Sequence, residues 1–171
     1  NCEMRGGGGI NGAIQAAAGP ELLQSMIREA PNGCATGKVV VTPGFNTGFN
    51  YIFHTPGPVW KGGAQDEEGL LSDCYWNCLN EANMLNLDSI GFCSISTGIY
   101  GYPMQEAANV AIKTTFEYLI CAHECKTCSL DTIVFSMYTL AEYEAFCAAL
   151  ISVSNTFIKI QETDDIEKTK N

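Results

Sequence analysis

Residues 89–103 read SIGFCSISTGIYGYP, and this stretch decides the fold class. Residues 89–95 form an apolar run with the pattern of a buried strand, and residues 96–103 form a loop rich in glycine and small polar side chains. A helical pattern follows over residues 104–122. A buried strand joined by such a loop to a helix is typical of α/β domains, in which ligands gather beyond the carboxyl ends of the strands.

Strands and helices alternate along the rest of the chain. β-Branched and aromatic runs predict further strands at residues 38–42, 51–55 and 132–138. Apolar spacing predicts further helices over residues 13–18, 22–30, 66–87 and 140–151. This order predicts an α/β fold with a largely parallel or mixed sheet that helices cover on both faces.

The sequence also predicts one helix N-cap and the buried faces of two helices. Asn11 stands before an alanine-rich run and is of a residue type preferred at an N-cap. The second helix is expected to carry Leu22 and Leu23 on one face. The last helix is expected to turn three side chains inward: Tyr143, Cys147 and Leu150.

Composition and charge exclude several classes of protein. The 171 residues are 46% hydrophobic and 16% charged, which is globular and not disordered. A net charge of −10 argues against non-specific nucleic-acid binding. No apolar run has the length of a membrane span and no signal-peptide pattern opens the chain. The nine cysteines are odd in number and several lie in apolar patterns, which favours reduced thiols. Together these features favour a soluble intracellular protein, cytoplasmic or nuclear.

The first candidate for chemistry is the segment GGGGINGAI at residues 6–14, which leads into a helix. Without Cβ atoms, several main-chain N–H groups can converge on one phosphate next to the positive end of a helix dipole. The alternative is a flexible linker. A phosphate site made of main-chain N–H groups needs no lysine or arginine, so it suits an anionic ligand in an acidic protein.

The second candidate is the loop STGIYGYP at residues 96–103. Ser96 and Thr97 offer hydroxyl groups, Gly98 and Gly101 allow unusual backbone angles, and Tyr100 has a ring that a sugar could lie against. The alternative is an ordinary loop between a strand and a helix. Two small-residue loops that meet at one place would be stronger support than either alone.

Four segments in one order resemble the macro domain family, on its hydrolase-like branch, over about residues 1–151. They are residues 1–23 (NCEMRGGGGINGAIQAAAGPELL), 33–46 (GCATGKVVVTPGFN), 51–63 (YIFHTPGPVWKGG) and 89–103. The resemblance implies a three-layer α/β/α fold with a mixed sheet and a cleft above it for ADP-ribose. It also implies ADP-ribose and ADP-ribosylated proteins as partners, and no cofactor is expected. The charge argues against a nucleic-acid partner and the lack of a long apolar run argues against a membrane.

The resemblance assigns roles to individual residues. Asn1 matches the asparagine that binds the distal ribose, Tyr138 falls where an aromatic ring often lies beside adenine, and His54 matches a strand residue that is more structural than catalytic. The first phosphate loop matches Gly7, Gly8, Gly9 and Ile10. The second loop, around the pyrophosphate and distal ribose, matches Ser96, Thr97, Gly98, Ile99, Tyr100 and Gly101.

One departure from the family concerns catalysis. The hydrolase-like branch usually has aspartate at the position of Asn11, and that carboxylate is thought to orient or activate the attacking water. Asparagine keeps the shape and the hydrogen bonds, but it cannot accept a proton or place a full negative charge near a cationic transition state. We therefore count Asn1 and Asn11 as the catalytic positions and expect binding to be retained with weak or absent hydrolysis.

A second departure concerns the start of the chain, where the opening strands of the family are absent or displaced. Residues 1–151 are then a macro domain that is truncated or permuted, and residues 152–171 are either an acidic tail or a displaced first strand. The strand-like run is residues 157–160, followed by Asp165 and Ile166. The solvated tail is the simpler interpretation.

A third feature is the run CAHECKTC, residues 121–128, with three cysteines and His123. A zinc site usually takes two separated ligand pairs, and only one cluster exists here, so no metal is expected.

Three functions remain open. They are a module that binds ADP-ribose, an enzyme that removes ADP-ribose from acidic side chains or deacetylates O-acetyl-ADP-ribose, and, more remotely, a zinc-bearing structural module. Asn11 favours the binding module, whereas the hydrolase-like loops and the compact single-domain length favour the enzyme.

Overall fold

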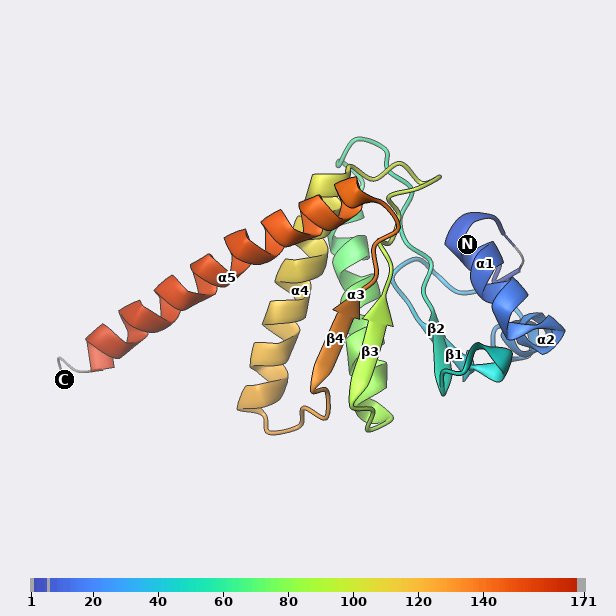
Figure 1. The fold of residues 1–171 in the computed structure, drawn as a ribbon, viewed down its shortest axis with the longest axis horizontal. Coiled ribbons are helices and arrows are strands. Elements are labelled where there is room, and N and C mark those ends of the chain that lie inside the picture. The colour runs from blue at the N-terminus through green and yellow to red at the C-terminus, as the bar shows by residue number, and fades with distance from the viewer. Residues whose placement is uncertain (1, 6, 169–171) are drawn as a thin grey trace.

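Helices and short strands alternate in the computed structural model of the chain, which describes residues 2–5 and 7–168, with side chains as far as Phe157. Figure 1 shows the elements along the chain. They are α1 (Gly9–Ala18), α2 (Pro20–Glu29), β1 (Val40–Pro43), the 3-10 turn η1 (Phe45–Thr47), β2 (Tyr51–His54), α3 (Glu67–Met84), β3 (Ser89–Phe92), α4 (Met104–Glu124), β4 (Thr132–Phe135) and α5 (Leu140–Lys168).

The four strands form a mixed arrangement in two pairs. β1 and β2 pair antiparallel, with Val40 opposite His54, and β3 and β4 pair parallel, with Ser89 opposite Thr132. Figure 1 draws them in the order β4, β3, β2, β1, so β3 and β2 are the inner strands. Within residues 2–5 and 7–168 these inner strands are not hydrogen-bonded to each other, and no strand precedes α1.

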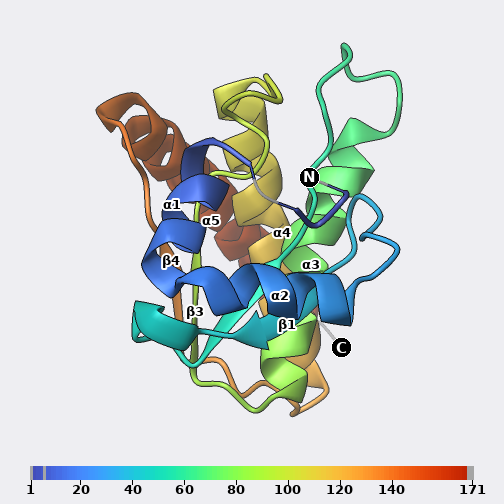
Figure 2. The same cartoon turned by 90° about the vertical axis from the view of Figure 1, so that its right-hand side faces the viewer.

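Helices lie on both sides of the strands, which makes the fold three-layered. Figure 2 shows α1 and α2 on the side nearest the viewer, with β1 behind α2 and with α3 and α4 farther back. The helices α1 and α2 bury one apolar cluster that includes Leu22 and Met26, against which Val40 and Ile52 pack from the strands. The neighbouring strand residues Val39 and Phe53 pack against the other cluster, as the two-residue period of a strand requires.

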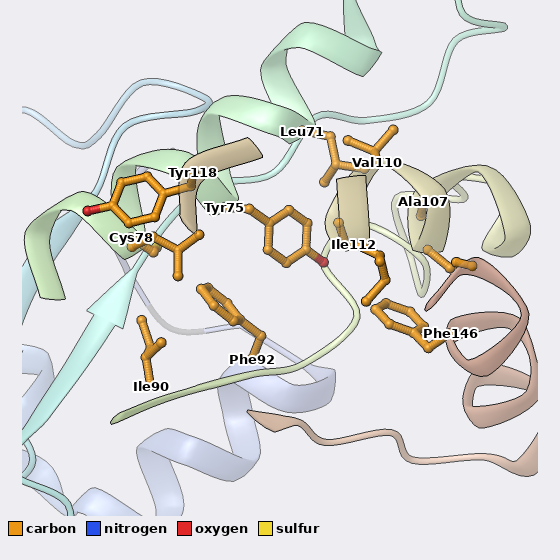
Figure 3. Packing of buried hydrophobic residues seen from close by; sticks show 14 of the residues in the cluster. Leu71, Tyr75, Cys78, Ile90, Phe92, Ala107, Val110, Ile112, Tyr118 and Phe146 are labelled. Carbon is orange, nitrogen blue, oxygen red and sulfur yellow. The ribbon is translucent and has the colours of Figure 1, made fainter. Parts of the chain in front are cut away.

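The larger cluster joins β3 and β4 to α3, α4 and α5 (Figure 3). Along β3, Ile90 and Phe92 are buried and alternate with the exposed Ser89 and Gly91. Fully buried Tyr75 of α3 lies edge-on to Phe92, with ring centroids 5.2 Å apart. Its hydroxyl accepts the main-chain N–H of Ile95 at 3.2 Å, which fixes the chain just before the second glycine-rich loop.

The sequence pattern placed three helix details wrongly. The N-cap of α1 is Gly8, and Asn11 lies inside the first turn. Leu22 is fully buried, but Leu23 is 36% exposed, because neighbouring residues of a helix point about 100° apart around its axis. On α5 the buried residues are Ala145, Phe146 and Ala149, whereas Tyr143 and Leu150 are exposed and Cys147 is half-buried.

The chain is helical as far as Lys168, over residues where a displaced strand had been considered. Residues 157–160 continue α5, which runs to Lys168 and extends away from the other elements in Figure 1. The ring of Phe157 stacks on Phe116 of α4, with centroids 5.4 Å apart, so this part of the helix is held by packing. Searching the described residues finds no helix with the length and apolar character of a bilayer span.

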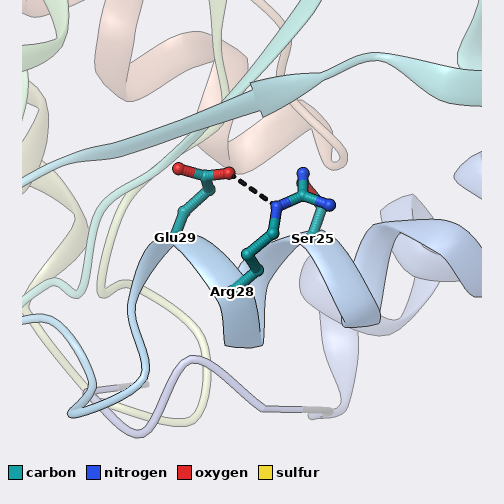
Figure 4. A network of polar contacts seen from close by, with 3 residues as sticks. All are labelled: Ser25, Arg28 and Glu29. Carbon is teal, nitrogen blue, oxygen red and sulfur yellow. Dashed lines mark hydrogen bonds and ion pairs between the residues drawn. The ribbon is translucent and has the colours of Figure 1, made fainter.

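Charged side chains contribute little to holding these layers together. On α2, Arg28 Nε lies 3.0 Å from Glu29 and a second guanidinium nitrogen donates to Ser25 at 3.2 Å (Figure 4). Both charged side chains of this pair are largely exposed, and exposed pairs contribute only about 0–1 kcal/mol. The fold therefore depends on the two apolar clusters.

Candidate functional site

The two glycine-rich segments lie at the same end of the molecule. The loop of residues 96–101 follows the carboxyl end of β3, and in Figures 1 and 2 it lies beside the start of α1, where residues 7–10 are found. The sequence predicts two small-residue loops that meet beyond the strands. The views place both segments at one end of the molecule, and their joint role as a site stays a prediction.

The first segment forms the start of α1, where no side chain caps the helix. Gly8 is the N-cap, in an extended conformation, and Gly9 has φ of +60°. A Cβ atom on either residue would meet nothing within 4 Å, so the space beside them is open. The N–H groups in the first turn of a helix have no intrahelical acceptor, and no acidic residue lies in this first turn. The N–H groups of this first turn are therefore available to bind an anion.

The second segment is a closed turn held by its own main chain. The N–H of Tyr102 donates to the carbonyl of Ser96 at 3.0 Å, and the N–H of Gly101 donates to that of Gly98 at 2.9 Å. The Thr97 hydroxyl donates to Ser94, so it is occupied within the loop. Ile99, at the tip, is 88% exposed.

Ser96 combines two unusual features. Its φ is +66°, in the left-handed region that favours glycine, and its buried Oγ has no hydrogen-bond partner in the described part of the chain. That oxygen lies against Gly57, where an added Cβ would overlap it. Non-glycine residues held in this conformation cost about 1–3 kcal/mol and cluster at ligand sites, where the surroundings enforce them.

Trp60 fastens this loop to the preceding part of the chain. Its main-chain N–H donates to the carbonyl of Tyr100 at 2.9 Å, and its ring lies 4.6 Å from that of Tyr102. The loop is thus held by Tyr75 at one end and by Trp60 at the other. Neither residue was identified from the sequence, because only the folded chain brings them to the loop.

Asn11 faces its own helix. Its Oδ1 accepts a hydrogen bond from Gln15 Nε2 at 3.1 Å, and the residue is half-buried. As an amide it supplies no titratable oxygen at this position. Asn1, the other predicted catalytic position, lies outside the described residues.

Tyr138 is 95% exposed, between β4 and α5. Its main-chain N–H and that of Thr139 donate to the carboxylate of Glu142 at 2.7 and 3.0 Å, while the N–H of Glu142 donates to Thr139 Oγ1 at 3.2 Å. This reciprocal pair is a capping box, and its signature TLAE was readable in the sequence. It fixes the backbone at Tyr138 and leaves the ring open to solvent.

His54 is a structural histidine. Its Nε2 lies 2.9 Å from the hydroxyl of Thr42 on the neighbouring strand. Burial lowers the pKa of His54 to about 4, so its ring is neutral at neutral pH. A base with so low a pKa has little driving force to take up a proton near pH 7.

No cationic side chain belongs to either glycine-rich segment, since residues 7–14 and 96–103 contain no lysine, arginine or histidine. An open depression of about 290 Å³ lies elsewhere, between α3 and α4, with Asp66, Glu68 and Glu117 among its lining residues. These three carboxylates outnumber the one cationic side chain of the lining, that of Lys113, which disfavours a phosphate. No metal-binding group of three or more His, Cys, Asp or Glu side chains occurs in the described part of the chain, where Cys121 and Cys125 are exposed.

Comparison with known proteins decides the family. The family model described as "Macro domain" matches residues 1–111. The chain belongs to the macro domain family. A macro domain-containing protein of Ralstonia nicotianae is 44% identical over 150 residues, which cover 88% of this chain and 82% of that protein.

Two further comparisons bear on the ligand. An O-acetyl-ADP-ribose deacetylase of Salmonella typhimurium is 45% identical over 121 residues, or 70% of this macro domain chain and 68% of the enzyme. The solved structure of the Oceanobacillus iheyensis macrodomain with ADP superimposes with a TM-score of 0.83 at 35% identity, covering 91% of this chain and 82% of that one. The three-layer macro domain fold is thereby established.

Proposed function

We propose that this macro domain binds ADP-ribose, free or attached to protein, in the space between residues 7–10 and 96–101. The observation that carries the proposal is the open, uncapped start of α1 beside the closed turn of residues 96–101. Main-chain N–H groups at both places can share the charge of a pyrophosphate, and no acidic side chain of the first turn repels it. The ADP-bound Oceanobacillus structure supports a diphosphate at this fold.

Calorimetric titration with ADP-ribose tests the binding. We expect saturable heat with ADP-ribose and ADP, and weaker binding of AMP, which lacks the second phosphate. Gly98→Val places a branched side chain where the structure leaves open space and is expected to weaken ADP-ribose binding about 10-fold or more, by excluding the phosphate from close approach. Gly91→Val is the matched control, because Gly91 also faces open space but lies on β3.

A second function, removal of an ester-linked group or of ADP-ribose itself, is favoured by the relative named O-acetyl-ADP-ribose deacetylase. Here Asn11 holds the position at which the hydrolase-like branch usually has aspartate, so we propose slow or absent turnover. The test compares the unchanged chain with Asn11→Asp. It measures the turnover of O-acetyl-ADP-ribose and of ADP-ribosylated protein by each. Equal and fast turnover by both would contradict the role given to Asn11.

ADP-ribosylated proteins in the cytoplasm or nucleus are the expected partners, and nucleic acid is not, because the net charge of −10 repels its phosphates. A filter-binding titration with single- and double-stranded DNA at low salt checks the second point.

A further inference from the structure

Glu67 is a buried carboxylate without a basic partner among the described ion pairs. It is the first residue of α3 and is only 2% exposed. Its two oxygens accept three main-chain N–H groups: Oε1 takes those of Lys61 at 2.9 Å and Gly63 at 3.3 Å, and Oε2 takes that of Gln65 at 2.6 Å. The side chain therefore points back from the helix and holds the preceding loop, residues 61–65, by these hydrogen bonds.

The charge state of Glu67 follows from these contacts. Burial by itself raises the pKa of a carboxyl group, but the converging N–H groups outweigh burial and the pKa of Glu67 is lowered. The carboxylate is consequently ionised at neutral pH. An ionised acceptor forms stronger hydrogen bonds than a neutral one, so the loop of residues 61–65 is firmly held.

The loop that Glu67 gathers is continuous with the candidate site. Gly62 and Gly63 have φ of +99° and +82°, so residues 61–65 adopt a turn that requires glycine, and the position of a Cβ on Gly63 is 3.0 Å from the Trp60 ring. Trp60 in turn holds the carbonyl of Tyr100 and the ring of Tyr102.

We propose that Glu67 is a positioning residue for the ADP-ribose site: it fixes the loop of residues 61–65, and through Trp60 it sets the conformation of residues 96–101. The proposal rests on the binding function proposed above. Glu67 touches no ligand in this scheme. It keeps the second loop in its strained, closed form before the ligand arrives, which lowers the ordering cost of binding.

Two substitutions at Glu67 and one beside it test this role. Glu67→Ala removes all three hydrogen bonds, and Glu67→Gln keeps the shape but presents an amide N–H₂ group to one of the main-chain donors. Glu68→Gln is the matched control, because Glu68 has the same charge, lies in the same helical turn and is exposed. Leu79→Ala, in the buried face of α3, controls for a loss of stability alone.

Two readouts are needed. Calorimetry with ADP-ribose, well below each melting temperature, is expected to show weakening of about 10-fold or more for Glu67→Ala and a smaller loss for Glu67→Gln. Glu68→Gln and Leu79→Ala should bind as the unchanged chain does. In a Trp76→Phe background, acrylamide quenching of Trp60 without ligand is expected to increase in the Glu67 variants only.

Wild-type affinity in a folded Glu67 variant overturns the proposal, and so does unchanged quenching of Trp60. If Glu67→Ala does not fold, Glu67→Gln decides with the same two measurements. If the unchanged chain gives no heat with ADP-ribose, the proposed binding function fails instead. The quenching experiment then still tests whether Glu67 holds the loop.

Discussion

The hydroxyl of Thr42 and Nε2 of His54 lie 2.9 Å apart on neighbouring antiparallel strands. They are not directly opposite, because His54 pairs with Val40 and Thr42 pairs with Ile52. The two side chains therefore meet diagonally across the pair of strands, and Thr42 is almost completely buried. This contact places a neutral imidazole inside the fold.

Acid should destabilise the protein through His54. The folded protein keeps this ring neutral down to about pH 4, whereas an unhindered imidazole takes up a proton near pH 6.5. The free energy of unfolding is therefore unaffected by His54 above about pH 6.5. It falls as the pH drops toward 4, by up to about 3 kcal/mol, because the unfolded chain takes up a proton that the folded one does not. Urea unfolding from pH 7.5 to 4 should show a shallower loss for His54→Gln. His123→Gln, at the exposed second histidine, should follow the unchanged chain.

Adjacent leucines on α2 should differ in their contribution to stability. Leu22→Ala removes a fully buried side chain from the smaller cluster and is expected to cost about 2–5 kcal/mol, because a cavity remains. Leu23→Ala changes a side chain that is 36% exposed and should cost much less. Chemical denaturation of both variants measures the difference. Equal losses would show that Leu23 is also a core residue.

The capping box at the start of α5 should hold the backbone beside Tyr138. Thr139→Ala removes the acceptor for the N–H of Glu142 and is expected to lower the free energy of unfolding by about 1 kcal/mol. Thr139→Ser keeps the oxygen and serves as the control. Circular dichroism during thermal unfolding reports both, and a loss of the same size in the serine variant would contradict this role of the oxygen.

A methyl group at Gly57 should disturb the second loop. The Cβ of Gly57→Ala would overlap Ser96 Oγ and the side chain of Ile95, so residues 95–96 must shift. We expect weaker ADP-ribose binding, by about 10-fold, since the closed turn begins at Ser96. Gly91→Ala, at a glycine with open space around it, should leave affinity unchanged. Calorimetry measures both variants, and unchanged binding by Gly57→Ala would mean that the loop tolerates the shift.

Local pattern was sufficient for the type and order of most elements. The predicted strand at residues 51–55 became β2 (Tyr51–His54), and the predicted helix at residues 104–122 became α4 (Met104–Glu124). Pro56 and Gly57 follow β2 closely, and Pro103 directly precedes α4. Strand pairing was less accessible, because the separation between β2 and β3 depends on which distant segments meet and leaves no local signal.

The wrong helix face on α5 has a physical reason. The prediction assigned the inner face to the large residues Tyr143 and Leu150, but Ala145 and Ala149 are buried there with Phe146. α4 also contributes alanines to the same cluster. Small side chains on both helices permit close approach, so the alanines and not the largest residues define the contact.

Residue type explains why some members of the candidate site were named from the sequence and others were not. Glycines at residues 7–9 and 98 indicate close approach of a ligand to the backbone, because glycine has no side chain. The family resemblance assigns these positions to the two ligand-binding loops. Glu67 gives no such signal, since an acidic residue in the first turn of a helix is usually exposed. Only the folded loop of residues 61–65 shows that its carboxylate points inward.

The division of the apolar interior into two clusters has a consequence for how the molecule comes apart. Leu22 and Met26 belong to one cluster, and Tyr75 and Phe92 to the other. In the part of the chain that the structure describes, the two strand pairs are not hydrogen-bonded to each other, so side-chain packing, such as that of Val39 and Phe53 on the larger cluster, connects the two clusters. We therefore expect α1, α2 and their strands to open as a separate cooperative unit, with amide hydrogens that exchange at a lower free energy than those of α3 and α4.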